Sequence, residues 1–423
     1  MRSSQQTLFA GIVAMMFAGS LAAAAEPARQ DDWHWVASWG AAQQLPEPNN
    51  ELPAEQWRDA SLRQIVHLSL GASRLRVRIS NAFGTTPLFI DGASVARARA
   101  PGSADIAADS VRALTFEGSP SIMIPAGAEY YSDPVTLAHA AGTDLAISMH
   151  FKGEPSRQTG HPGSRATSFT VKGNRIADAA WPDAGKVVHW YALADVEVQA
   201  PRRVGVLAAI GDSITDGHGV TTDTNDRWPD QLALRLAREG APAMGMLNTG
   251  IGGGRMLRDG LGPNLASRFD RDVIARSGVT HALVLIGVND LGGQHRSGED
   301  QPEARAKMLD DLMNAHRQLV ARAHAHGICV LGATLPPYVD SDYYRPGADN
   351  EGDRQRLNNW IRTSGVFDSV VDFDAALRDP ANPKRMLAQY DYGDHLHPSP
   401  AGYRAMAEAI PLKALQQHCD IAK

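Results

Sequence analysis

Apolar and polar positions alternate in short runs along the first half of the chain. Residues 74–80 (RLRVRIS) and 145–151 (LAISMHF) each place a large apolar side chain at every second position. This period of two is typical of half-buried antiparallel strands. Turn-forming clusters such as PGSAD and EGSPS separate the runs. Residues 26–200 are therefore predicted to form a β-sandwich domain with a jelly-roll-like arrangement of strands.

The pattern changes after the linker VQAPRRV, where continuous apolar runs of strand length alternate with helical stretches. The apolar runs are VGVLAAIG, MGMLNTG, THALVLIG, CVLGATL and VFDSVVDFD. Strands that are apolar throughout and separated by helices form a parallel sheet with both faces covered. Residues 201–423 are therefore predicted to form a three-layer α/β/α domain.

The first residues match a secretory signal rather than a folded element. Arg2 is followed by an apolar run from Leu8 to Leu21 and by small residues that end at Ala25. This order is typical of a cleaved signal peptide, here residues 1–25. The run is short for a membrane span, and an uncleaved anchor is the alternative. We expect export to a periplasm or to the medium, with no stable membrane anchor.

Composition narrows the functional classes. A formal net charge of −6 and the lack of a basic run argue against nucleic acid as a partner. The two cysteines, Cys329 and Cys419, are too few for a disulfide scaffold. Cys329 lies in the apolar run ICVLGATL and is expected in a buried strand, and a bridge to Cys419 stays open.

Four polar or glycine-rich segments directly follow the predicted parallel strands. They are GDSITDG, which contains Ser213, then GIGGGR, GVND and PPYVDSDYY. Ligand sites in such folds form outside the carboxyl ends of the strands, so these loops should meet at one edge of the sheet. The short linker keeps the β-sandwich near that edge, and we expect it to border the cleft.

Near the C-terminus, the segment DYGDHLHPSPAGY offers a base for the serine. A serine hydroxyl needs a base to become a nucleophile, and the base needs a group that fixes its tautomer. Asp394 and His397 are three residues apart, while Pro398, Ser399 and Pro400 are typical of the start of a helix that anchors the loop. The carboxylate can reach one imidazole nitrogen while the other nitrogen faces the nucleophile.

The same edge could supply donors for the oxyanion of an ester-hydrolysis intermediate. Gly250 and the glycines 252–254 can expose main-chain N–H groups, and Asn289 can offer its side-chain amide. Taken alone, GDS is commonly a turn, and GVND could cap a helix through Asp290. GIGGGR lacks the third glycine of a dinucleotide site because Arg255 stands there. In this order after successive strands, the segments together favour a hydrolase.

Three of these segments and part of the C-terminal segment resemble the sequence blocks of the SGNH (GDSL-type) hydrolases. GDSITDG resembles the first block, NTGIGGGR the second, GVND the third and DHLH the last. The resemblance implies a flavodoxin-like fold and a catalytic triad of Ser213, Asp394 and His397. It also implies an oxyanion hole formed by the Ser213 amide, Gly253 and Asn289, with the two neighbouring glycines as alternatives to Gly253.

The segment WVASWGAAQ (35–43) and the β-sandwich resemble the two-domain secreted members grouped with acetyl xylan esterases. No serine lies in G-x-S-x-G, which argues against an α/β-hydrolase. We expect an exported serine esterase that removes a small acyl group, acetyl above all, from a small-molecule or polysaccharide ester, without metal or organic cofactor. The alternatives are a lipolytic esterase or lysophospholipase, an O-acyltransferase and a non-catalytic carbohydrate-binding protein.

Several aromatic and histidine side chains have two interpretations. Three tyrosines after the fourth parallel strand could stack on sugar rings or pack their loop down: Tyr338, Tyr343 and Tyr344. His161 in GHPGSR could border the cleft, but a plain loop histidine is favoured. His218 and His395 adjoin the triad segments and could contact substrate. Three histidines on or near the predicted helix 302–325 are expected on its solvated face: His316, His324 and His326.

Overall fold

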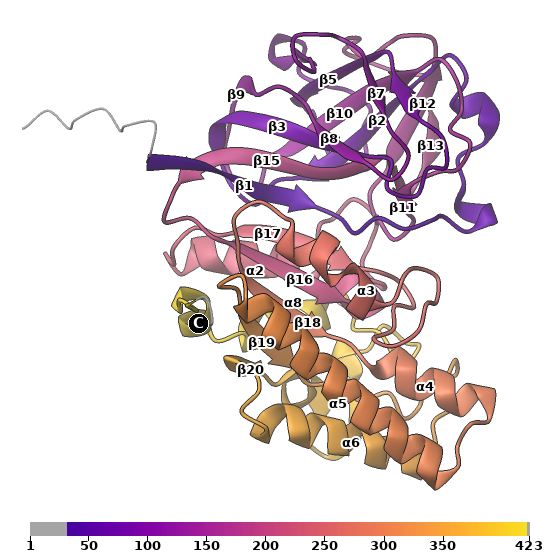
Figure 1. Ribbon diagram of the computed structural model, residues 1–423, viewed down its shortest axis with the longest axis vertical. Helices are drawn as coiled ribbons and strands as arrows, with labels where there is room; N and C mark the ends of the chain where they lie inside the picture. Colours follow the sequence, from indigo (N-terminus) through magenta and orange to yellow (C-terminus); the bar gives the residue numbers. More distant parts are fainter. Residues whose placement is uncertain (1–31, 421–423) are drawn as a thin grey trace, which may run out of the picture.

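The computed structural model describes residues 32–420, so the predicted signal peptide lies outside the described residues. Figure 1 shows an all-β region in its upper part, residues 33–201, called here the β region. The lower part, residues 206–416, is called the α/β region. Among the described residues, no helix is long and apolar enough to cross a membrane.

The β region contains two large antiparallel sheets. One has the strand order β1-β15-β3-β8, with β9 also paired to β3, and the other has the order β13-β12-β2-β10-β5-β6. Alternate side chains such as Val77 on β3 and Ile147 on β10 are fully buried in a shared core, as the period of two predicts. The jelly-roll arrangement stays a prediction. The strands are β1 (Trp33–Gly40), β2 (Ala60–His67), β3 (Ala72–Ser80), β4 (Leu88–Ile90), β5 (Gly92–Arg97), β6 (Arg112–Leu114), β7 (Ile122–Ile124), β8 (Glu129–Tyr131), β9 (Val135–His139), β10 (Asp144–Phe151), β11 (Gly160–His161), β12 (Ser168–Lys172), β13 (Gly185–Val187), β14 (Trp190–Tyr191) and β15 (Leu193–Pro201).

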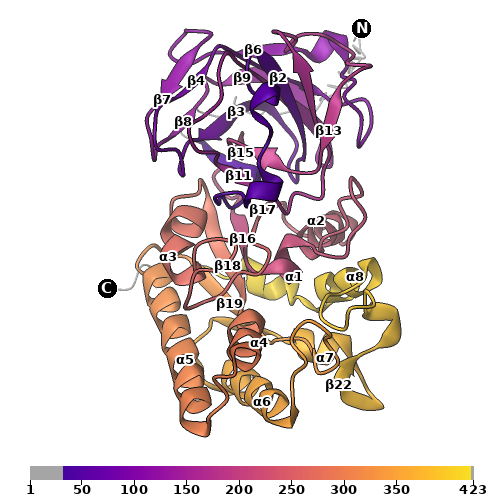
Figure 2. The same cartoon turned by 90° about the vertical axis from the view of Figure 1, so that its right-hand side faces the viewer.

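The α/β region is built on a five-stranded parallel sheet of order β17-β16-β18-β19-β20. In chain order this is 2-1-3-4-5, the flavodoxin-like arrangement. Helices α3 and α5 lie on one side of the sheet and α2 and α8 on the other (Figure 2), which confirms the three-layer prediction. The sheet strands are β16 (Val206–Gly211), β17 (Gly245–Gly250), β18 (Val279–Leu285), β19 (Cys329–Ala333) and β20 (Ser369–Val371), and a hairpin adds β21 (Arg378–Asp379) and β22 (Asn382–Met386). The helices are α1 (Ser213–Asp216), α2 (Trp228–Arg238), α3 (Leu265–Phe269), α4 (Val288–Ser297), α5 (Pro302–His324), α6 (Ala348–Thr363), α7 (Phe373–Leu377) and α8 (Pro400–Ala409).

Local sequence explains where several helices begin. Ser399 caps α8 by accepting a hydrogen bond from the Gly402 amide at 3.2 Å, and Pro400 occupies the first helical position, as predicted. Helices α2 and α5 also carry proline in their first turn. After Asn264, the chain forms the short helix α3 and continues directly into a π-helical segment, Asp270–Ile274.

The β region covers the edge strand of the parallel sheet. Strand β1 runs beside β17, and just beyond it Ala41 forms a parallel bridge with Asn248. The two regions are also joined by an ion pair, in which Asp195 of β15 lies 2.6 Å from Arg276 of the α/β region. Both side chains are fully buried. Removing one partner of such a pair leaves an uncompensated buried charge. The charged contact therefore ties the two regions together.

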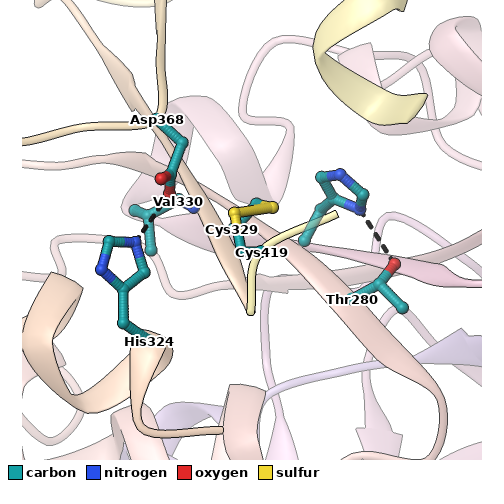
Figure 3. Close-up of a disulfide and its surroundings, with 7 residues drawn as sticks. Thr280, His324, Cys329, Val330, Asp368 and Cys419 are labelled. Carbon is teal, nitrogen blue, oxygen red and sulfur yellow. Dashed lines mark hydrogen bonds and ion pairs between the residues drawn. A yellow bond between two sulfur atoms is a disulfide. The ribbon is translucent and has the colours of Figure 1, made fainter. Parts of the chain in front are cut away.

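A disulfide joins Cys329, the first residue of β19, to Cys419 in the C-terminal segment (Figure 3). Beside it, His324 Nε2 lies 2.9 Å from Asp368 Oδ2. The expectation of a solvated face is wrong for His316, which is 1% exposed and packs against the rings of Trp360 and Phe367. The α6 helix and the segment before β20 cover this side of α5, which its sequence pattern does not reveal.

Candidate active site

Ser213 begins helix α1 directly after strand β16. Glycine is required at the end of the strand, because a Cβ at Gly211 would lie 2.4 Å from the carbonyl oxygen of Leu285 on the neighbouring strand β18. Asp212 caps α1 by accepting a hydrogen bond from the Ile214 amide at 3.0 Å, and burial raises the pKa of its carboxyl to about 7. The strand, its glycine and the cap fix the serine at the carboxyl edge of the sheet.

The three predicted triad residues meet at this edge. Ser213 Oγ lies 2.8 Å from His397 Nε2. On the other side of the ring, His397 Nδ1 lies 2.6 Å from Asp394 Oδ2. The carboxylate accepts the Nδ1 proton, so Nε2 keeps a lone pair and can accept the serine proton. The arrangement is a chain from nucleophile to base to orienting carboxylate.

Hydrogen bonds keep Asp394 ionised. Its Oδ1 accepts the main-chain N–H groups of Leu396 at 3.0 Å and His397 at 2.9 Å. Burial alone would raise the pKa of Asp394, but the bond from the His397 side chain and these two amides outweigh it and lower that pKa. A carboxylate that stays charged in mild acid can stabilise an imidazolium throughout that range.

Asn289 and the glycine loop lie beside the nucleophile at the predicted oxyanion position. Asn289, 3% exposed in the first turn of α4, donates from Nδ2 to the Gly254 carbonyl at 2.8 Å, which leaves its second N–H for an oxyanion. The Gly254 amide donates to the Ile251 carbonyl at 2.9 Å, whereas Gly253 has a φ of +65° that favours glycine. This favours Gly253 over Gly254 as the second donor.

Asp290 binds the same glycine loop rather than capping α4. Its two carboxylate oxygens accept the main-chain N–H groups of Met256 at 2.9 Å and Leu257 at 3.1 Å. Burial raises the pKa of Asp290 to about 6 against the effect of these bonds. GVND therefore connects the third strand to the loop after the second one.

Comparison with known proteins identifies the α/β region. Residues 209–405 match the model of the GDSL-like Lipase/Acylhydrolase family. The α/β region is similar to the members of this family across the matched segment. The protein is accordingly a carboxylic ester hydrolase, and its Ser-His-Asp chain lies within the matched residues.

Solved structures similar to this esterase include three from such enzymes. A GDSL-like lipase from Bacteroides thetaiotaomicron has 18% identity and a TM-score of 0.37 over 51% of this chain and 88% of its own. An acetyl xylan esterase has 20% identity and a TM-score of 0.36 over 48% and 97%. A carbohydrate acetylesterase family member from Sinorhizobium meliloti has 17% identity and a TM-score of 0.36 over 48% and 94%. No curated protein matches the chain.

Two of the three tyrosines proposed to stack on sugar rings are buried in the esterase. Tyr338 is 2% exposed and Tyr344 is 5% exposed, so neither ring offers a free face. Tyr344 instead donates its hydroxyl proton to Asn289 Oδ1 at 2.5 Å and orients that amide. Only Tyr343 is exposed, with the Arg296 guanidinium over its ring at 4.3 Å. The loop packs down because its neighbours on α4 and α6 cover it.

The β region contributes directly to the esterase site, as the short linker predicts. His161 of β11 is 2% exposed, and its Nε2 lies 2.9 Å from Oδ1 of Asp216, the last residue of α1. The interpretation of His161 as a plain loop histidine is therefore wrong. Arg165, four residues on, donates from Nη2 to His218 Nδ1 at 3.0 Å. The sequence did not indicate that Arg165 lies at the site, because its contact with His218 joins segments that are far apart in the chain.

His218, His395 and Tyr392 lie around the triad. The His218 ring is 4.0 Å from that of His397, centroid to centroid. Tyr392, which was not predicted, is 54% exposed and meets the His218 ring edge-on at 5.8 Å. His395 adopts a left-handed φ of +58° and binds Asp391 through Nδ1 at 2.6 Å, so its contact is with that carboxylate. Exposed Tyr392 thus lies at the rim of the site.

Two groups of described residues have metal-ligand geometry. His218, Asp394 and His397 have ligand atoms within 4.8 Å of one another, but the hydrogen bonds of the last two to each other and to Ser213 assign them to proton transfer. The second group is His324, Asp368 and Cys419, and the disulfide removes the thiolate that a metal would need.

Proposed function

We propose that the protein is an exported serine esterase that removes acetyl or another small acyl group from a carbohydrate ester. The observation that carries the reaction is the unbroken chain from Ser213 Oγ through His397 to Asp394, with Asn289 held beside it. Each element of this set has a role in acyl transfer to a serine. Export rests on the signal-like pattern of residues 1–25.

The reaction follows from these positions. His397 Nε2 accepts the Ser213 proton as Oγ attacks the ester carbon, and Asp394 stabilises the imidazolium that forms. The oxyanion receives hydrogen bonds from Asn289 and from main-chain amides of Ser213 and Gly253. His397 then protonates the leaving alcohol. In the second half, His397 activates water, which attacks the acyl-enzyme and releases the acid and the free serine.

The carbohydrate part of the proposal rests on the rim of the site and on the resemblance of WVASWGAAQ to two-domain acetyl xylan esterases. Tyr392, on the segment that carries Asp394 and His397, and Tyr343, on the loop after β19, are exposed, and exposed aromatic rings offer apolar faces for sugar rings. The β region adds its own side chains beside the triad. A site to which two regions contribute side chains suits a large alcohol group and a small acyl group.

A panel of esters tests the proposal, with the Ser213→Ala variant as the matched control. We expect acetate release from p-nitrophenyl acetate and acetylated xylan without any added acceptor alcohol, and slower cleavage as the acyl chain lengthens. Preference for lysophospholipid or long acyl chains would instead indicate a lipolytic enzyme. Acetate transfer only when an acceptor alcohol is present would indicate an acyltransferase, and inertness toward every ester would indicate a binding protein.

A further inference from the structure

A segment of the β region, residues 160–167, reaches the triad and is anchored at both ends. At one end, His161 binds Asp216. At the other end, Asp223 accepts hydrogen bonds from the Thr167 amide and hydroxyl, both at 2.6 Å, and donates its own amide to the Arg165 carbonyl at 2.9 Å. Arg165 is held in the left-handed region with φ of +48°, which is uncommon and costly for a residue other than glycine. These contacts position its guanidinium.

The Arg165 contact fixes the protonation of His218. A guanidinium has five N–H donors and no acceptor, so the His218 Nδ1 that it meets at 3.0 Å must carry a lone pair. The imidazole is therefore neutral, with its proton on Nε2. The main chain of His218 is fixed as well, because its amide donates to the Ser213 carbonyl and its carbonyl accepts the Tyr403 hydroxyl.

The His218 ring lies against the catalytic imidazole. The two rings are 4.0 Å apart and tilted by 38°, and His218 Nε2 is 4.0 Å from the same Asp394 oxygen that accepts the His397 proton. That separation is too long for a hydrogen bond but short enough for electrostatic attraction. The titratable and charged groups around His218 are Arg165, His397, Asp394, Asp216, Tyr392 and Tyr403. Burial, together with His397 and Arg165, lowers the pKa of His218 to about 4.

We propose that Arg165 is a positioning residue of the triad, supplied by the β region, that holds His218 as the neutral Nε2–H tautomer beside His397. Catalysis requires His397 to become an imidazolium, and a second imidazolium stacked on it would oppose that step. Arg165 donates a hydrogen bond to Nδ1, the only nitrogen of His218 that could take up a proton. The His218 ring separates the charge of the guanidinium from the His397 ring. The proposal rests on the serine-esterase mechanism but on no particular alcohol.

The pH profile of kcat/KM on p-nitrophenyl acetate tests this role. In Arg165→Met, His218 can take up a proton in mild acid, so the acid limb should begin at higher pH and become steeper. We expect a loss of about tenfold near pH 6 and a much smaller loss near pH 8.5, where His218 is neutral with or without Arg165. Arg165→Gln keeps a donor without the charge and should lie between parent and Arg165→Met.

The His218→Phe background provides the control. There, adding Arg165→Met should leave the acid limb unchanged, because no second imidazole remains. A parental acid limb in Arg165→Met, or a shift that persists in the double variant, would overturn the proposal. A loss of equal size at every pH would mean that Arg165 acts only through folding or loop placement.

A measurement on the unmodified protein needs neither a variant nor a substrate. Long-range proton–nitrogen correlation spectra of the full, nitrogen-15-labelled chain report which nitrogen of each histidine carries a proton. We expect His218 to show an unprotonated Nδ1 and a protonated Nε2 between about pH 5.5 and 8. A His218 cation at pH 6, or the opposite tautomer, would contradict the proposal whatever ester the enzyme cleaves.

Discussion

Two histidine–aspartate pairs flank helix α1, and only one of them belongs to the triad. His397 Nδ1 lies 2.6 Å from Asp394 near the first residue of the helix, and His161 Nε2 lies 2.9 Å from Asp216 at its last residue. Both imidazoles are buried, with 8% and 2% of their surface exposed. Their carboxylate contacts are therefore nearly equivalent.

The two pairs differ in the partner of the second imidazole nitrogen. His397 Nε2 faces the Ser213 hydroxyl, which can donate its proton, so the ring is a neutral base with an open lone pair. His161 Nδ1 faces the Ala42 carbonyl at 2.8 Å, which can only accept. Among the described residues, His161 therefore faces no hydroxyl group from which it could take a proton. His397 can act as a base, whereas His161 joins the β region to the nucleophile helix.

The largest expected effect is loss of the triad. Replacing Ser213 or His397 with alanine should lower kcat by about 10⁴–10⁶-fold, and the double variant should be little worse, because the two residues act as one unit. Steady-state kinetics on p-nitrophenyl acetate measures this. Strictly multiplicative losses in the double variant would mean that the two side chains do not share one proton transfer.

Asn289→Ala should lower kcat by about 10²–10³-fold with little change in KM, because its amide contacts a charge that exists only in the transition state. Tyr344→Phe, which removes the bond that orients this amide, should lower kcat in the same direction by less. Thermal melts provide the control for folding. Unaltered kcat in a stable Asn289→Ala variant would remove this residue from the oxyanion hole.

His161→Ala should act on stability rather than on chemistry. It leaves Asp216 buried without its hydrogen-bond partner, and an unsatisfied buried polar group costs about 1–3 kcal/mol. Denaturant unfolding should show this loss, and a His161→Ala/Asp216→Asn variant should recover part of it. If the folded His161→Ala protein lost turnover as completely as His397→Ala, the distinction between the two pairs would fail.

His316 extends the comparison to a buried histidine with no hydrogen-bond partner among the described residues. Burial lowers its pKa from 6.5 to about 4, so between these values the unfolded chain binds a proton that the folded chain does not. The free energy of unfolding therefore decreases as the pH falls below 6.5. The decrease due to His316 reaches about 3 kcal/mol near pH 4.

His316→Leu should accordingly be less sensitive to acid than the parent when urea midpoints at pH 7.5 and pH 5 are compared. His326, which is exposed and lies just after the same helix, provides the matched control, and His326→Gln should behave like the parent. An unchanged acid response in His316→Leu would show that this ring is not held neutral by burial.

Sequence alone predicted the features that depend on local pattern. The parallel sheet covered on both faces, the start of α8 at Ser399 and the meeting of Ser213 with Asp394 and His397 follow from periodicity, caps and the rule that sites form at the carboxyl edge. The order of the strands was expected only from the resemblance to the SGNH hydrolases. The strand-to-loop order of the segments was sufficient to place residues about 180 positions apart at one point.

Features that depend on which distant segment covers a side chain were not predictable in this way. The position of His316 in the helical pattern is compatible with a solvent-exposed face of α5, but α6 packs over this side chain. Tyr344 lies in a tyrosine-rich loop that is typical of a ligand-binding site, yet its hydroxyl group donates a hydrogen bond to Asn289. Arg165 and His161 come from a β region whose packing against α1 has no signature in a single sequence. Such contacts are set by tertiary packing between distant segments, which leaves no local pattern in the sequence.

Covalent labelling tests the central claim, that Ser213 is the nucleophile activated by His397. Treating the protein with an organophosphate such as diethyl p-nitrophenyl phosphate, followed by peptide mass spectrometry, should place one diethylphosphoryl group on the peptide that contains Ser213, with parallel loss of esterase activity. His397→Ala should label far more slowly, whereas His161→Ala should still label while folded. Inactivation with the label on another residue, or undiminished activity with Ser213 fully modified, would contradict the account.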